Sequence, residues 1–287
     1  MTDHIDDFYT ARNLLYLGAY PQALTSLSHV HATSSQEPEQ QSLKHRALLL
    51  QGTTTMLSSL PTALPLYQAV HLLPQRNTPE AIEAITPLLT TANLASATFA
   101  AVAAQVLGEL GRDEALRILA MHPRSLECVA LSVALLLGMD RADMAQKLVA
   151  KSRGWAEDAP LAQMAEAWVA LHVGGAKYTE GLYIFDEMAQ AVAAETPLLL
   201  NARAVCRMHL GQVPEAEELL LQALGMQPGH ADTLANLVVC ANLSAKTLET
   251  KERYLGQLRD AAPQHPFVSD LDAKSAEFDQ LALRFTQ

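Results

Sequence analysis

Apolar positions along the chain recur at intervals of three and four residues, and no useful stretch alternates apolar and polar residues as a half-buried strand does. From Thr78 onward, glycines interrupt this pattern repeatedly and leave room for helices of about 10–15 residues, a common helix length in folded proteins. Ala and Leu are abundant, and both are good helix formers. The chain is therefore predicted to be all-α.

Small residues stand at fixed distances after a turn in residues 211–228. The turn residue Gly211 is followed by Ala216, by Ala223 seven positions later, and by the closing Pro228. This is the second half of a tetratricopeptide-type repeat, whose unit is about 34 residues long. Small side chains at these positions let a neighbouring helix approach closely, so Ala216 and Ala223 are predicted to lie at helix–helix contacts.

The same frame recurs along the chain in degenerate form. Ala145 and Gly181 occupy the small position, and the steps from Ala145 to Gly181 to Ala216 are 36 and 35 residues. Gly18 and Ala23 show the same turn-to-small interval near the N-terminus. This periodicity predicts an α-solenoid, in which tetratricopeptide-like helical hairpins form a curved superhelix and each unit packs only against its neighbours.

The repeat array is predicted to cover residues 1–265, and a helix over 266–287 is predicted to cap it within the same domain. Pro266 suits the first turn of a helix. Apolar residues then recur at helical steps as one stripe, which we expect to pack against the array while the acidic side faces water. The stripe consists of Phe267, Leu271, Phe278, Leu281 and Phe285.

Residues 84–108 carry no charge and are long enough to cross a bilayer. Pro87, Asn93 and Gln105 dilute the stretch, and Ala is only weakly apolar. We therefore expect buried, tightly packed helices here. Residues 52–98 as a whole are rich in proline, which limits helix continuation, so helix positions there are not readable from the pattern.

Charge and cysteine content narrow the setting. With 20 basic and 31 acidic residues, the formal net charge is −11, which opposes the counterion release that drives nucleic-acid binding, so no nucleic acid is expected as a partner. The cysteines Cys128, Cys206 and Cys240 are far apart and lie in apolar helical sequence, which suggests neither a disulfide framework nor a zinc site. The first ten residues are acidic without an apolar core, so no targeting segment is predicted and a reduced, cytosolic setting is expected.

Catalytic signatures are missing from the sequence. It contains no phosphate-binding glycine loop, no HExxH and no GxSxG motif. His29 and His31 are two residues apart, which points them in different directions on a helix. No catalytic, cofactor-binding or metal-binding residue is therefore predicted. An enzyme with a degenerate helical fold is a competing hypothesis, and it requires a polar pocket with clustered titratable residues.

Function is instead expected on the surface that a tetratricopeptide frame turns toward its concave side, mainly on the first helix of each pair. The predicted groove positions are small, apolar or acidic, and they lack the lysines and arginines that would clamp an acidic C-terminal tail. Glu127 is placed on the same face. The predicted partner-binding residues are Ala130, Ala134, Glu166, Ala170, Leu198, Asn201, Val205 and His209.

Several longer blocks resemble the epsilon subunit family of coatomer, the coat of Golgi-derived transport vesicles. The blocks SLEC at 125–128, YIFDEMA at 183–189 and QHPFV at 264–268 are more specific than a tetratricopeptide frame. The resemblance runs in the right order over most of the chain, but residues 52–98 depart from it. The similar stretches are 6–24, 125–147, 165–189, 196–224, 230–241 and 253–268.

The resemblance implies a non-enzymatic structural subunit of the COPI coat, without cofactors, in Golgi-to-ER and intra-Golgi transport. It implies binding to, and stabilisation of, the C-terminal domain of the coatomer alpha subunit, around an extended segment of which the array curls. It also implies a cytoplasmic protein that is peripheral on Golgi membranes and coated vesicles, with membrane contact only through the coat. The alternative is an unrelated cytosolic tetratricopeptide scaffold for another client.

Overall fold

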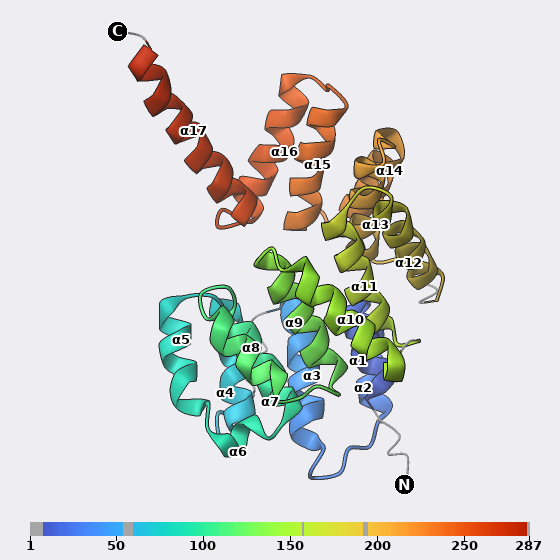
Figure 1. Ribbon diagram of the computed structural model, residues 1–287, viewed down its shortest axis with the longest axis vertical. Coiled ribbons are helices and arrows are strands. Elements are labelled where there is room, and N and C mark those ends of the chain that lie inside the picture. The colour runs from blue at the N-terminus through green and yellow to red at the C-terminus, as the bar shows by residue number, and fades with distance from the viewer. Residues whose placement is uncertain (1–7, 54–59, 157, 192–194, 286–287) are drawn as a thin grey trace. The chain divides into compact units, whose positions relative to one another are not determined.

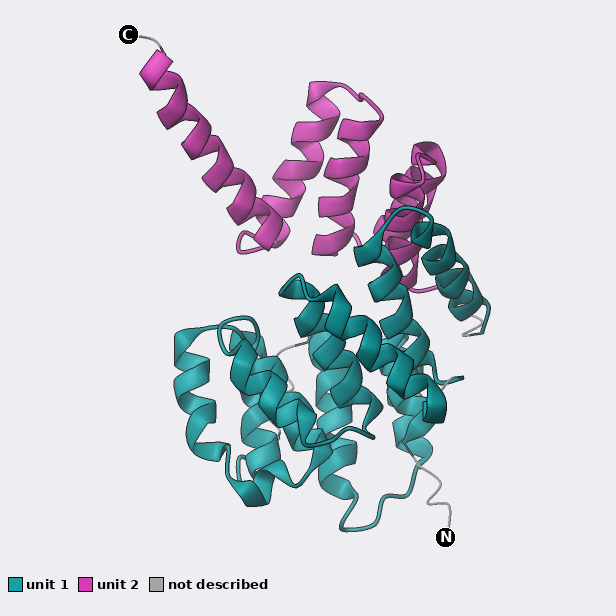
Figure 2. Ribbon diagram, viewed as in Figure 1, with its two compact units in different colours: residues 1–194 teal, residues 195–287 magenta. Residues whose placement is uncertain are grey.

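The computed structural model describes residues 8–53, 60–156, 158–191 and 195–285. Within these residues all regular secondary structure is helical, which confirms the predicted all-α class (Figure 1). The chain divides into two compact units, residues 1–194 and residues 195–287 (Figure 2). Helices α1 to α12 belong to unit 1, and α13 to α17 belong to unit 2. The predicted boundary between residues 1–265 and 266–287 stays a prediction.

The helices of unit 1 are α1 (Tyr9–Tyr16), α2 (Tyr20–His29), α3 (Glu37–Leu50), α4 (Pro65–Leu72), α5 (Pro79–Ile85), α6 (Thr91–Leu94), α7 (Ala97–Leu107), α8 (Arg112–Ala120), α9 (Leu126–Gly138), α10 (Ala142–Ala156), α11 (Pro160–Val173) and α12 (Lys177–Ala191), with 3₁₀ turns η2 (Leu73–Gln75) and η3 (Thr86–Leu88). The helices of unit 2 are α13 (Pro197–His209), α14 (Val213–Met226), α15 (Ala231–Leu243), α16 (Leu248–Ala261) and α17 (Pro266–Phe285).

Small residues on the second helices of the hairpins are buried, as the repeat frame predicts. Ala145 on α10, Gly181 on α12, and Ala216 and Ala223 on α14 are all buried, and the two α14 alanines have no exposed surface. Gly18 has a φ of 79°, a conformation that glycine adopts at little cost, and it connects α1 to α2. The hairpin pattern of the sequence is therefore confirmed in both units.

The proline-rich segment forms short helices whose starts are set by proline. Pro65 and Pro79 occupy the first positions of α4 and α5, where a missing N–H costs nothing. The uncharged stretch contains η3, α6 and α7. Helix α7 is apolar on nearly all sides and lies in a large hydrophobic cluster of unit 1, so the predicted burial is confirmed for α7. It is wrong for η3 and α6, neither of which contains a buried residue. None of the described helices has the length and apolar character needed to span a membrane.

The predicted rule that each repeat packs only against its neighbours is wrong for unit 1. On α3, the Oε1 atom of Glu39 accepts hydrogen bonds from Arg12 on α1 at 2.8 Å and from Thr98 on α7 at 2.9 Å. Arg46 of α3 forms an ion pair with Glu127 of α9, and α1 also contacts α11. Figure 1 shows α3 beside α9. The N-terminal helices therefore contact later repeats, and the charged side chains Glu39 and Arg46 of α3 are paired there.

The predicted contact of the last helix with the array is also largely missing. In α17 only Val268 is buried, and every side chain from Ser269 to Phe285 is exposed. Val268 packs with Leu234 of α15 and Leu258 of α16. The helix is thus attached at its first turn, and its apolar stripe stays uncovered beyond that point.

Candidate protein-interaction surface

Four of the predicted groove residues lie on neighbouring helices of unit 1, but only part of this set reaches the surface. Ala134 on α9 is exposed. Ala130 on α9 and Ala170 on α11 are buried, so the expectation that they face solvent is wrong. Glu166 on α11 is partly exposed and forms an ion pair with Arg153 of α10. Ala130 and Ala170 are buried because α9 packs closely against α11 and covers the small residues between the two helices.

Glu127 is not exposed to solvent as the repeat frame predicts, because it is the buried partner of Arg46. Their side chains are 7% and 4% exposed, and Arg46 Nη2 donates to Glu127 Oε1 at 2.5 Å and to the hydroxyl of Tyr16 at 3.1 Å. Burial raises the pKa of Tyr16 far above its usual value, and the negative charge of Glu127 raises it further. Tyr16 therefore stays protonated, and the three residues join α1, α3 and α9.

A pocket of about 190 Å³ lies next to this cluster. Tyrosine, tryptophan and arginine are enriched at the cores of protein–protein interfaces, and all three line this pocket. The repeat frame could not predict it, because the pocket forms only when α1 packs beside the start of α9 and α11. Its lining residues are Tyr9, Arg12, Asn13 and Tyr16 from α1, Arg124, Ser125, Leu126 and Glu127 at the start of α9, Trp155 of α10 and Leu161 of α11.

In unit 2, three predicted groove residues share one face of α13. Leu198, Val205 and His209 follow one another at steps of seven and four residues, which places them within about 40° of one another on the helix. Leu198 and Val205 are half-buried, and His209 is exposed. This face of α13 is therefore at least partly exposed to solvent.

Asn201, the fourth predicted residue on α13, is buried and turned toward α15. Its Nδ2 donates to the Pro197 carbonyl and to Thr233 Oγ1, both at 2.7 Å, and its Oδ1 accepts from Asn236 at 2.9 Å. Thr233 Oγ1 is in turn 2.9 Å from Nδ1 of His230, which caps α15. The role of Asn201 is structural, since a polar side chain at this depth is stable only when it is hydrogen-bonded.

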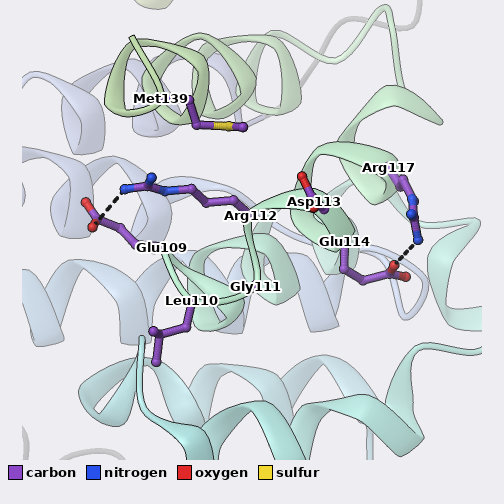
Figure 3. A pocket seen from close by; sticks show the side chains of 8 residues that line it. All are labelled: Glu109, Leu110, Gly111, Arg112, Asp113, Glu114, Arg117 and Met139. Carbon is purple, nitrogen blue, oxygen red and sulfur yellow. Dashed lines mark hydrogen bonds and ion pairs between the residues drawn. The ribbon is translucent and has the colours of Figure 1, made fainter. Parts of the chain in front are cut away.

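A second pocket lies at the turn between α7 and α8 (Figure 3). Four of the five charged side chains that line it form ion pairs, Arg112 with Glu109 at 2.9 Å and Arg117 with Glu114 at 3.1 Å, and the fifth, Asp113, is in neither pair. Glu109 and Glu114 therefore face cations instead of each other. Among the residues that the structure describes, no group of three His, Cys, Asp or Glu side chains is arranged to hold a metal ion.

Nearly the whole chain resembles one known family. The sequence model of the family described as the coatomer epsilon subunit matches residues 4–286. The chain belongs to this family. It is similar to coatomer subunit epsilon-2 of Oryza sativa subsp. japonica, with 33% identity over 96% of this chain and 96% of that protein. Coatomer subunit epsilon-1 of Arabidopsis thaliana is 32% identical over 98% of the chain and 97% of that protein, and coatomer subunit epsilon of Caenorhabditis elegans is 29% identical over 96% and 98%.

A solved structure shares the fold of this epsilon-family chain. The crystal structure of the APC/C hetero-tetramer Cut9-Hcn1 matches with a TM-score of 0.63 over 91% of this chain and 54% of that chain, at 14% identity. At this identity the likeness concerns the fold alone. Together with the hairpin pattern, it makes the chain an all-α, tetratricopeptide-like solenoid and confirms the predicted fold class.

Proposed function

We propose that the chain is a structural subunit of the COPI vesicle coat that binds and stabilises the C-terminal domain of the coatomer alpha subunit. The observation that carries this proposal is the match to the epsilon subunit family over residues 4–286, nearly the whole chain. A stack of helical hairpins suits the role, because such folds offer extended surfaces to segments of other proteins.

The exposed face of α13 is the proposed contact surface in unit 2, and the pocket between α1, α9 and α11 is the proposed contact in unit 1. The α13 face consists of Leu198, Val205 and His209. Its partly exposed apolar side chains suit a partner segment that brings apolar groups and its own backbone hydrogen bonds. In unit 1 the aromatic pair Tyr9 and Trp155, at 46% and 40% exposure, would anchor the contact.

The proposed role is one of binding, without catalysis and without a cofactor, in Golgi-to-ER and intra-Golgi transport. The protein works in the cytoplasm and on the surface of Golgi membranes and COPI vesicles. Its contact with the membrane is indirect, through the assembled coat. A net charge of −11 disfavours direct binding to anionic lipid or to nucleic acid, which supports a protein partner.

Val205→Glu tests this proposal. A carboxylate on the α13 face must lose water in the interface without finding a cation, so binding to the C-terminal domain of alpha should weaken on the order of a hundredfold if the position is central. Titration calorimetry measures the affinity, and circular dichroism checks the helicity. Leu221→Glu is the matched control, since Leu221 is an exposed apolar residue on α14, outside the proposed surface.

A folded Val205→Glu variant that binds as tightly as the parent would show that the partner uses another surface. If the folded parent chain does not bind the alpha domain at all, the proposed function fails. Co-purification with an unrelated large client would then favour the alternative of a cytosolic scaffold.

A further inference from the structure

The pocket between α1, α9 and α11, which we call the unit 1 pocket, has one positive charge that the described residues do not compensate. Arg12 and Arg124 line it, and Arg46 contacts its lining residue Glu127. Arg12 forms an ion pair with Glu39 at 2.8 Å, and Arg46 forms one with Glu127 at 2.5 Å. Arg124 is exposed, and it forms no ion pair with a carboxylate of the residues that the structure describes. Three arginines therefore face two carboxylates here.

The part of the pocket next to Arg124 is also the start of α9. Ser125 and Leu126 line it there, and Ser125 Oγ accepts the N–H of Cys128 at 3.5 Å as the N-cap. The first N–H groups of a helix have no partner within the helix and carry partial positive charge. Their charge adds to that of Arg124, which directly precedes the cap. This part of the pocket therefore favours a negatively charged group.

The rest of the pocket wall is aromatic and apolar. Tyr9 and Trp155 are partly exposed, and Leu161 is buried beside them. The volume of about 190 Å³ is below the roughly 300–1,000 Å³ of sites for drug-sized ligands, so the pocket suits a single side chain. A carboxylate on an aliphatic stem matches both parts, because the stem can pack on the aromatic rings while the carboxylate pairs with Arg124.

We propose that the unit 1 pocket holds one aspartate or glutamate side chain of the C-terminal domain of the alpha subunit, with its carboxylate paired to Arg124. This inference rests on the proposed function for its partner and names the group that the pocket recognises. One uncompensated arginine suits a single acidic side chain, whereas an acidic tail needs several cations. A second copy of the chain or an anionic bilayer is a poor occupant, because a net charge of −11 repels both.

The experiment compares Arg124→Gln with Arg76→Gln in the full chain. Arg76 is an exposed arginine of unit 1 that does not line the pocket. With the C-terminal domain of alpha as probe, Arg124→Gln should weaken binding about tenfold or more in titration calorimetry, because the bound carboxylate loses its counter-charge. Arg76→Gln should bind like the parent. Added salt should weaken binding of the parent more than binding of Arg124→Gln, since the variant lacks the screened ion pair.

A double-mutant cycle identifies the carboxylate. Each Asp and Glu of the alpha domain is replaced in turn by its amide, and binding to the parent and to Arg124→Gln is measured. At one position the replacement should weaken binding to the parent about tenfold and leave binding to Arg124→Gln nearly unchanged. If no acidic side chain of the alpha domain is coupled to Arg124 in this way, the proposal is overturned.

The outcomes separate this inference from the proposed function. If the parent binds the probe and Arg124→Gln binds equally well, the inference is refuted while the proposed function stands. If the folded parent does not bind the probe, both fail. A parent dimer in light scattering that Arg124→Gln dissociates would identify a second copy as the occupant. A lower melting temperature of free Arg124→Gln, but not of Arg76→Gln, would show that the chain itself supplies the carboxylate. Either result overturns the proposal.

Discussion

The ion pair between Arg46 and Glu127 joins helices that are far apart in the sequence, and Glu127→Ala removes one side of it. The two residues are separated by 81 positions, and both side chains are almost completely buried. The substitution leaves the Arg46 guanidinium in the interior without its counter-charge, a loss of about 3–5 kcal/mol for a buried pair.

In unit 1, with its 194 residues, each kcal/mol shifts the melting temperature by about 2–4 °C, so the expected decrease is about 6–20 °C. Calorimetry or circular dichroism measures this shift. Replacing both residues, as in Arg46→Met with Glu127→Leu, should recover most of the loss, since no buried charge remains.

Glu166→Ala is the matched control, because its ion pair with Arg153 lies at the surface, where the side chains are 32% and 53% exposed. Such pairs contribute at most about 1 kcal/mol. If Glu127→Ala lowers the melting temperature no more than Glu166→Ala does, the ion pair between Arg46 and Glu127 does not stabilise the packing of α3 on α9.

Three further predictions concern single side chains. Ala223 has no exposed surface, so Ala223→Leu should destabilise the protein by about 1–3 kcal/mol through overpacking, and an unchanged melting temperature would argue against a close helix contact. Burial lowers the pKa of His230, and its neutral Nδ1 accepts the backbone N–H of Thr233 at 3.3 Å. As the pH falls below about 6.5, His230 becomes protonated more readily in the unfolded chain than in the folded one, so the free energy of unfolding should decrease. Denaturant titrations should show that His230→Asn reduces this pH dependence. An equal pH dependence in the variant would contradict the prediction. Burial raises the pKa of the Cys128 thiol to about 11, so a thiol reagent at pH 8 should label it only after unfolding, and rapid labelling of the native chain would refute its burial.

Structural features that depend on neighbours along the chain can be predicted from the sequence alone. The turn at Gly18 and the buried Ala145, Ala216 and Ala223 follow from spacing within one hairpin. The burial of α7 is also predictable, because a helix that is apolar on nearly all sides must be surrounded by other elements. The same pattern wrongly predicts burial for η3 and α6, which have no buried residue.

Features that depend on residues far away in the sequence cannot be predicted from the local pattern. The local pattern around Arg46 does not reveal that Glu127 lies beside it, so the repeat frame places Glu127 in a solvent-facing groove. The same frame places Asn201 in the groove with Val205. The Asn201 side chain instead points toward α15, where its amide group donates a hydrogen bond to Thr233. In α17 the stripe predicts a contact, but it does not specify whether the array or another protein makes it.

The central claim is that this epsilon-family chain forms a complex with the C-terminal domain of the alpha subunit. The most direct test is co-expression of the two, followed by size-exclusion chromatography with light scattering. We predict a single species with the mass of a one-to-one complex. Separate elution of the two proteins, with the chain still helical by circular dichroism, would contradict the account.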